Sequence, residues 1–249
     1  MIEAVIFDYG GTLVVPSRSF DDEKPNAVRS SYNLLRRNGL TLSYEEYLAR
    51  NNAVFKRYSE IEKREERDIP DLLKYEEMIG ELFPGRPEPW RTKVAQRADD
   101  AFWEVVVRNY PIRRETRRTL SRLRSMDLRL GIVSNHHNHG SLVKHLRDLG
   151  IAHYFARVIS SAEFGTRKPD SRIFLACLSA LNVKDPRKAV FVGDSPRNDV
   201  EGARSAGLHT ILIVDDPPLP VPRGGDKMNT KADYTVHSLS EIPRIIPSL

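Results

Sequence analysis

The sequence predicts an α/β protein with a Rossmann-like, doubly wound parallel sheet as its core and an inserted all-helical cap domain. Short apolar runs at residues 4–7 and 189–192 lack polar–apolar alternation, which is typical of strands buried on both faces of a parallel sheet. Strands and helices alternate along residues 110–249, whereas residues 17–109 carry helical patterns and almost no strand signal. We therefore expect an α/β core of residues 1–16 and 110–249, and a helical cap of residues 17–109.

The individual elements follow from local start and stop signals. Residues 16–25 are polar and contain two prolines, which predicts a linker. Ser43 and Glu46 have the spacing of a capping box, and Gly39 and Gly207 are expected to end helices. Helices are predicted at residues 27–38, 43–67, 71–82, 91–108, 115–125, 141–149, 170–181 and 198–206. Further strands are predicted at residues 128–133, 157–159, 209–214 and 234–236, and a Pro/Gly-rich loop at 217–225.

The composition narrows the classes of partner. Lys and Arg number 39 against 34 Asp and Glu, and this mild excess suits an anionic substrate without requiring nucleic acid. No apolar stretch approaches the length that spans a bilayer, and no signal peptide precedes the first strand. Cys177 is the single cysteine, so an internal disulfide is excluded. We expect a cytoplasmic monomer or homodimer that binds neither nucleic acid nor a membrane.

Polar residues follow three of the predicted strands. Asp8 ends the first strand, Ser134 and Asn135 end the second, and Asp194 ends the fourth, while Lys168 precedes the helix before that strand. Parallel strands bring such ends to one edge of the sheet, where ligands bind in open α/β folds. A carboxylate can attack phosphorus, a hydroxyl and an ammonium can hold a phosphoryl group, and a hard cation can offset the repulsion. The pattern indicates metal-assisted chemistry on a phosphate.

Four stretches carry a family resemblance. They are residues 7–13 (Phe-Asp-Tyr-Gly-Gly-Thr-Leu), 133–135 (Val-Ser-Asn), 165–170 (Gly-Thr-Arg-Lys-Pro-Asp) and 192–199 (Val-Gly-Asp-Ser-Pro-Arg-Asn-Asp). In this order and α/β context the sequence resembles the haloacid dehalogenase (HAD) superfamily of aspartate-nucleophile hydrolases. The helical insertion between the first and second stretches resembles the cap of phosphoglycolate phosphatase-like and 2-haloacid dehalogenase-like members.

The resemblance implies a Mg²⁺-dependent phosphatase that hydrolyses a small phosphorylated metabolite. Asp8 would be the nucleophile that forms an aspartyl-phosphate, assisted by Ser134 and Lys168. The magnesium ligands would be Asp8, the carbonyl of Gly10, Asp194 and Asp199, the last supporting the metal or its waters. The substrate-binding residues would be Gly11, Thr12, Ser134, Asn135 and Lys168.

One position departs from the family pattern. Phosphatases of this family usually carry a second Asp two residues after the nucleophile, where it protonates the leaving group, but this chain has Gly10. General acid/base catalysis contributes about 10²–10⁴-fold, so two alternatives stay open. One is a metal-independent 2-haloacid dehalogenase, and the other is a catalytically weak protein that binds a phosphate ligand. Dehalogenases typically lack the Gly-Asp pair of the last stretch, whereas this chain keeps Gly193-Asp194 together with Asp199, which favours the phosphatase.

The loop after the second strand and the cap supply further candidates. His136 and His137 could replace the missing acid/base, because histidine side chains generally titrate near neutral pH. The simpler interpretation is that both are exposed loop residues at the start of a helix. A transition-metal site on adjacent histidines would need support from other groups. The cap is expected to close over the site and to set substrate choice, with Arg18 and residues 84–90 as contacts. The sequence leaves open whether Tyr9 points into the site or the sheet.

Overall fold

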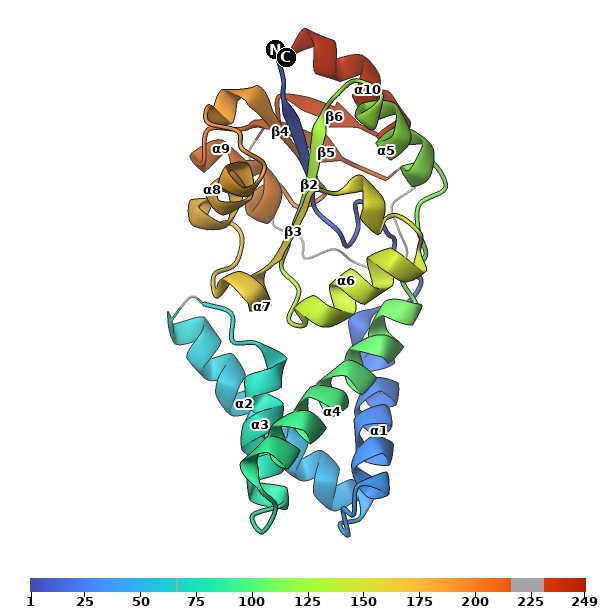
Figure 1. The fold of residues 1–249 in the computed structure, drawn as a ribbon, viewed down its shortest axis with the longest axis vertical. Coiled ribbons are helices and arrows are strands. Elements are labelled where there is room, and N and C mark those ends of the chain that lie inside the picture. Colours follow the sequence, from blue (N-terminus) through green and yellow to red (C-terminus); the bar gives the residue numbers. More distant parts are fainter. Residues whose placement is uncertain (66, 216–230) are drawn as a thin grey trace.

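The sheet has the predicted parallel topology. The computed structural model describes residues 1–65, 67–215 and 231–249, so the loop predicted at 217–225 lies outside the described residues. Within them, six strands pair in parallel in the order β3-β2-β1-β4-β5-β6 (Figure 1). The strands are β1 (Ala4–Phe7), β2 (Arg129–Ser134), β3 (Arg157–Ser160), β4 (Ala189–Gly193), β5 (His209–Ile213) and β6 (Tyr234–Val236).

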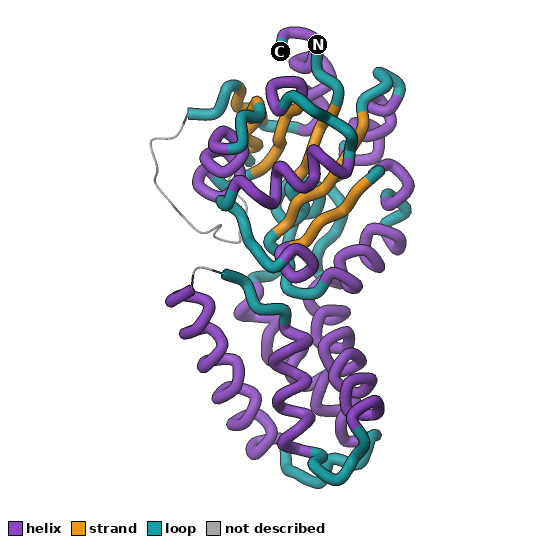
Figure 2. Tube along the Cα trace, turned by 60° about the vertical axis from the view of Figure 1, so that its left-hand side comes forward, coloured by secondary structure: helices purple, strands orange, loops and turns teal. Residues whose placement is uncertain are grey.

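Helices cover the sheet and form a separate layer beyond one of its edges (Figures 1 and 2). The cap helices are α1 (Phe20–Arg37), α2 (Tyr44–Glu65), α3 (Asp71–Leu82) and α4 (Glu88–Arg108). The others are α5 (Thr116–Arg124), α6 (His139–Asp148), α7 (Ser161–Phe164), α8 (Ser171–Ala180), α9 (Gly202–Ser205) and α10 (Ile242–Ile245). No described helix has both the length and the apolar character needed to cross a membrane.

The central strand β1 is apolar throughout because it faces a core on each side. Val5 and Phe7 pack into an apolar cluster with α5, α6 and α10. Ala4 and Ile6 point the other way, into a cluster with α8 and α9 that includes Cys177. All four strand side chains are fully buried, which explains why the run shows no polar alternation. The structure confirms the doubly wound α/β prediction.

The register brings the strand ends to one edge of the sheet. Phe7, the last residue of β1, lies opposite Ile132 of β2 and Val192 of β4. Asp8 therefore leaves the sheet at the edge where the polar residues at the ends of β2 and β4 also lie. This edge faces the helical layer (Figure 1).

The inserted helices α1 to α4 form an all-helical cap with an apolar core of its own. The buried side chains of this core include Leu35, Tyr47, Tyr75, Met78, Ala98 and Phe102. The chain crosses between the two parts twice, and the crossings run side by side. Val15 N donates to Pro111 O at 3.0 Å, and Ser17 N donates to Asn109 O at 2.8 Å. The cap insertion is confirmed, whereas domain boundaries at residues 16/17 and 109/110 stay a prediction.

The linker predicted at residues 16–25 is wrong in its second half, because α1 begins at Phe20. The side chain of Ser19 accepts a hydrogen bond from Asp22 N at 3.1 Å and caps the helix. The first turn is acidic, which favours a helix N-terminus. These interactions outweigh the backbone hydrogen bond that Pro25 removes.

The cap meets the core through buried polar contacts between α3, α4 and the loop that precedes α6. Asp71 N donates to His137 O at 3.3 Å, and Asn138 Nδ2 donates to Asp99 Oδ2 at 2.8 Å. Burial raises the pKa of Asp99 to about 9, with Asp71 nearby adding to the shift. The folded protein therefore keeps Asp99 protonated at neutral pH.

Replacing Asp99 with Asn should make the protein less sensitive to alkaline pH. In the unfolded chain Asp99 ionises near a pKa of ~3.9, so the folded state binds more protons between that pH and about 9. Stability contributed by the protonated group is lost as pH rises through this window. Asp99→Asn should equal the wild type near pH 4 and exceed it increasingly toward pH 9, as measured by urea unfolding across pH.

A matched control is Asp148→Asn, which neutralises an exposed carboxylate. The hydrogen bond from Lys144 lowers the pKa of Asp148, so its neutralisation should give no gain at alkaline pH. Parallel stability curves for the wild type and Asp99→Asn would contradict the assignment of a protonated Asp99.

Candidate active site

Asp8 occupies the centre of the site because β1 occupies the centre of the sheet. Its backbone N–H donates to Val192 O at 2.8 Å, and its side chain is buried. The hydroxyl of Thr12 reaches two carboxylates, with Oγ1 3.5 Å from Asp8 Oδ2 and 3.2 Å from Asp194 Oδ1. Gly11 has a positive φ of 87°, and a Cβ atom there would lie 2.6 Å from Asp194 Oδ2, so the backbone conformation and the close approach both favour glycine.

Lys168 joins two of the carboxylates. Its Nζ donates to Asp8 Oδ1 and to Asp199 Oδ1, each at 2.7 Å, and its side chain is almost fully buried. Burial alone would lower the pKa of Lys168, but the charges of Asp199 and Asp8 raise it above its ordinary value. Lys168 is therefore a permanent cation between two buried anions.

Asn135 positions the backbone of Lys168. Its Nδ2 donates to Lys168 O at 3.0 Å, and its Oδ1 accepts from Lys168 N at 2.8 Å. Both ends of the amide are thus engaged by one residue. Asn135 also lines the cavity beside Ser134, the buried last residue of β2, as the sequence predicts for this edge.

Asp199 holds the loop that follows β4. Its Oδ2 accepts from Asp194 N at 3.0 Å and from Ser195 N at 2.9 Å, while its Oδ1 bonds Lys168. The helix predicted at residues 198–206 instead begins as a π-helical turn at Pro196–Glu201, because the carbonyl of Ser195 accepts from two successive amides. This wide turn points the Asp199 carboxylate back toward the strand end.

The carboxylates offer a donor set for a metal ion. Asp8, Asp194 and Asp199 each place an oxygen within 4.8 Å of the others. Oxygen donors without nitrogen or sulfur suit a hard dication such as Mg²⁺. Because Lys168 brings one positive charge against three carboxylates, a dication would also balance the local charge. The residues present therefore fit Mg²⁺.

Arg113 is a site residue that the sequence patterns did not reveal. Its guanidinium donates to Gly11 O at 2.6 Å and to Thr12 O at 2.8 Å, and it forms an ion pair with Asp215. The arginine thereby holds the loop after β1 from the far side of the cap insertion. No local motif marks it, because its partners lie about a hundred residues away in the chain.

A cavity of about 1160 Å³ lies between the sheet edge and the cap. Its floor includes Asp8, Ser134 and Lys168. The cap contributes the apolar side chains Phe20, Phe55, Phe102 and Trp103 and the amines Lys24, Lys56 and Lys63. A mostly preformed pocket with a few convergent polar groups is typical of small-molecule sites.

The predicted cap contacts are wrong. Neither Arg18 nor any residue of 84–90 lines the cavity. Arg18 instead pairs with Glu23 at 3.3 Å. The segment joining α3 to α4 lies at the end of the cap farthest from the sheet (Figure 1), where Trp90 packs edge-on against Phe83. A long helical insertion has two ends, and only the packing decides which end faces the site.

The two histidines after β2 differ in environment. His136 is buried with its ring 4.5 Å from that of Trp103, so the prediction of an exposed position is wrong for it. Asn138 N donates to His136 Nδ1 at 3.2 Å, which places the proton of the neutral ring on Nε2. Burial lowers the pKa of His136 to about 3, so the imidazole ring is uncharged near neutral pH and cannot act as an acid there. His137 is partly exposed.

The direction of Tyr9 is settled by a partner on α6. Its hydroxyl forms a hydrogen bond with His145 Nδ1, and its ring is buried and stacked on Tyr110. Burial raises the pKa of Tyr9 above its ordinary value, so it stays protonated. The ring therefore forms part of the cavity wall, and its hydroxyl is engaged by the core.

Comparisons with known proteins agree with this arrangement. Residues 2–207 match the family model of haloacid dehalogenase-like hydrolases. The chain is 34% identical to glyceraldehyde 3-phosphate phosphatase of Methanopyrus kandleri, over 86% of this chain and 84% of that protein. It is 28% identical to the phosphatase of the same name in Methanocaldococcus jannaschii, over 100% of this chain and 99% of that protein.

Solved structures show the same fold. The 2-haloacid dehalogenase from Pseudomonas syringae pv. tomato DC3000 superposes with a TM-score of 0.67 and 22% identity, covering 100% of this chain and 99% of that one. A HAD phosphatase from Thermococcus onnurineus superposes with a TM-score of 0.57 and 23% identity, covering 98% of each chain. At this identity the likeness establishes the architecture of core and cap and leaves the reaction open.

Replacing Lys168 with Met should destabilise the protein by about 3–5 kcal/mol, because it leaves buried carboxylates without their cation. Urea unfolding at pH 7 measures the loss. The control is Lys188→Met, which removes an exposed ion pair with Glu3 and should change little. Equal effects of the two substitutions would show that the buried ammonium is not what holds Asp8 and Asp199 together.

Proposed function

Because the chain belongs to the haloacid dehalogenase-like hydrolase family, we propose that it is a Mg²⁺-dependent phosphatase. It would hydrolyse a small phosphorylated metabolite through an aspartyl-phosphate on Asp8. The observation that carries the proposal is the oxygen donor set of Asp8, Asp194 and Asp199 beside the buried ammonium of Lys168. Three carboxylates beside a single ammonium leave net negative charge that a dication would offset, which favours a metal-dependent reaction over a metal-independent one.

The first step of the proposed mechanism is attack of a carboxylate oxygen of Asp8 on phosphorus. The leaving-group oxygen departs with the bonding electron pair, and the phosphoryl group is left on Asp8. Lys168 fixes the carboxylate through Oδ1, and its charge favours the incoming phosphoryl oxygens. Ser134 lies at the adjacent strand end, where its hydroxyl can donate to a phosphoryl oxygen.

The second step is attack of water on phosphorus, which releases inorganic phosphate and restores Asp8. Asp8, the carbonyl of Gly10 and Asp194 would hold Mg²⁺. When bound, the ion supplies positive charge that offsets the repulsion between the carboxylate and the phosphate. Asp199 would support the ion or its waters, while one of its oxygens also bonds Lys168 and the other accepts from the amides of Asp194 and Ser195.

The proposed mechanism lacks an obvious side chain to protonate the leaving group. Gly10 has no side chain, and the neutral His136 supplies no acid near pH 7. A role for His137 in proton transfer stays a prediction. We infer that the enzyme favours phosphate esters whose leaving group departs without protonation, unless the substrate itself brings an acid.

The relatives suggest where to look for the substrate. Four of them are named for glyceraldehyde 3-phosphate, so this compound is the first candidate to assay. Another, from Halopiger xanaduensis, is named ribulose-1,5-bisphosphate 5-phosphatase and is 29% identical over 67% of this chain. A location in the cytoplasm and a monomeric or homodimeric state stay predictions.

The proposal predicts hydrolysis of p-nitrophenyl phosphate that requires Mg²⁺, stops in EDTA and is lost in Asp8→Asn. Asparagine keeps the shape of the side chain and removes its nucleophilic oxygen, so the loss should exceed about 10³-fold while thermal stability is retained. The measurement is the release of p-nitrophenolate, followed by its absorbance, with and without Mg²⁺.

Parallel assays with 2-chloropropionate separate the alternatives. Chloride release in EDTA would favour the dehalogenase and contradict the proposal of a Mg²⁺-dependent phosphatase. Turnover of neither compound, with phosphate still bound in calorimetry, would favour the weak binding protein. Full activity of Asp8→Asn would remove the aspartyl-phosphate from the mechanism.

Restoring the missing acid should broaden the substrate range. The nearest neighbour of a Cβ atom on Gly10 would be Tyr110 Cε2 at 3.9 Å, so a side chain has room to begin there. Gly10→Asp should raise kcat/KM for an alkyl phosphate such as glycerol 3-phosphate, up to about 10²-fold. It should change the value for p-nitrophenyl phosphate little, because p-nitrophenolate needs no proton.

The matched control is Gly10→Asn, which has the same size and cannot transfer the proton. An equal rise in kcat/KM for both variants would assign the gain to packing. No rise with Gly10→Asp would show that proton delivery does not limit alkyl phosphates in this site.

A further inference from the structure

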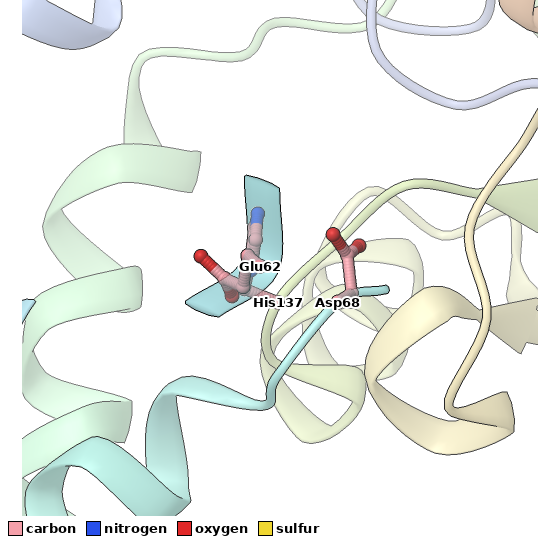
Figure 3. Close-up of side chains that lie close together, drawn as sticks. All are labelled: Glu62, Asp68 and His137. Carbon is pink, nitrogen blue, oxygen red and sulfur yellow. The ribbon is translucent and has the colours of Figure 1, made fainter. Parts of the chain in front are cut away.

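A second group of potential metal ligands lies where the cap meets the core (Figure 3). Glu62 comes from α2, Asp68 from the segment between α2 and α3, and His137 from the loop after β2. Each offers one ligand atom, and these atoms all lie within 4.8 Å of one another. The group therefore joins two side chains of the cap to one of the core.

Three atoms of this group are buried without a hydrogen-bond partner among the described residues, and only one of them, Asp68 Oδ1, has a close ion-pair partner. The side chain of Asp68 is fully buried, and although its Oδ1 lies 2.8 Å from Arg167 Nη1, its Oδ2 has no donor. His137 Nδ1 is likewise unpartnered, since the nearest carboxylate oxygen, Asp71 Oδ1, is 3.9 Å away. Buried polar atoms that lack partners are costly, and a bound ligand would satisfy both.

The donor chemistry selects the ligand. One imidazole nitrogen with two carboxylates suits a borderline transition metal such as Zn²⁺, whereas Mg²⁺ prefers oxygen alone. With metal–ligand bonds of about 2.0–2.2 Å, donors around one tetrahedral ion lie roughly 3.4 Å apart, so shifts on the order of 1 Å bring the three side chains onto one ion. Three protein ligands leave a fourth position open to water.

We propose that Glu62, Asp68 and His137 bind one divalent transition-metal ion that fastens the cap to the core. The two neighbouring cations, Lys74 and Arg167, do not give the site a net positive charge that would repel a metal ion, because each is paired with a carboxylate. Lys74 Nζ is shared between Glu62 Oε1 and Asp71 Oδ1, each at 2.9 Å, and Arg167 pairs with one oxygen of Asp68. Three carboxylates against two cations leave a negative site.

The ion would lie in the wall of the catalytic cavity. Glu62 and His137 both line that cavity, and His137 follows Ser134 by three residues. Bound metal would therefore hold the cap over the site and restrict its opening. The support that adjacent histidines need comes here from cap carboxylates, and only His137 takes part, since His136 uses Nδ1 for the amide of Asn138.

The test is calorimetric titration of Zn²⁺ into the metal-free full-length chain, with excess Mg²⁺ present to occupy the all-oxygen site. We expect one equivalent of Zn²⁺ to bind. Asp68→Asn, which keeps the shape, and His137→Ala should each weaken binding about tenfold or more, because each removes one of three ligands. His139→Ala is the control, since this nearby histidine contacts Ser160 and Glu163 outside the group.

A second readout follows the cap itself without any assay of activity. The amide of Asp71, which donates to His137 O at 3.3 Å, should exchange its hydrogen more slowly when Zn²⁺ is added to the wild type, and not in Asp68→Asn. Co²⁺ in place of Zn²⁺ should give an absorption band that His137→Ala abolishes.

Zn²⁺ binding that survives both Asp68→Asn and His137→Ala would overturn the proposal. So would binding that Asp194→Asn abolishes and His137→Ala leaves intact, because the ion would then occupy the catalytic carboxylates. If His137→Ala does not fold, as judged by circular dichroism, Asp68→Asn decides alone. Loss of phosphatase activity with Zn²⁺ binding unchanged would count against the proposed reaction and not against this site.

Discussion

A buried ammonium between two carboxylates is the interaction on which the arrangement of this site depends. Lys168 bonds Asp8 at the end of β1 and Asp199 in the turn after β4, so one side chain ties together two strand ends. Without it, two buried anions would face each other and one would have to take up a proton. Asn135 fixes the backbone of Lys168 from the end of β2, which places a third strand in the same network.

The cap covers this edge of the sheet and partly shields it from solvent. The sheet edge alone would expose the carboxylates to water, where electrostatic interactions are weak. The cap adds phenylalanines and lysines above them and forms one wall of a cavity large enough for a small metabolite. The same insertion brings Asp71, Asp99 and Glu62 against the loop after β2, so the contacts between cap and core are themselves polar.

Much of this site was accessible from sequence because parallel strands end at a common edge. Asp8, Ser134 and Asp194 were predicted to meet for that reason, and they do. The sequence did not predict the role of Arg113, because this residue donates to backbone carbonyls. Every residue type has such a carbonyl, so the partners of Arg113 cannot be recognised from their side chains. The burial of His136 was missed because its neighbour Trp103 comes from a different domain of the chain.

The sequence by itself determined the α/β core, the helical insertion and the identity of the chemical groups at the strand ends. Apolar periodicity and the succession of strands and helices along the chain are local properties of the sequence. Only the tertiary structure decided which end of the cap faces the site, that Asp199 serves Lys168 and two amides, and that His137 meets Glu62 and Asp68. Those outcomes depend on how helices pack across long separations in the chain, and no local pattern encodes that packing.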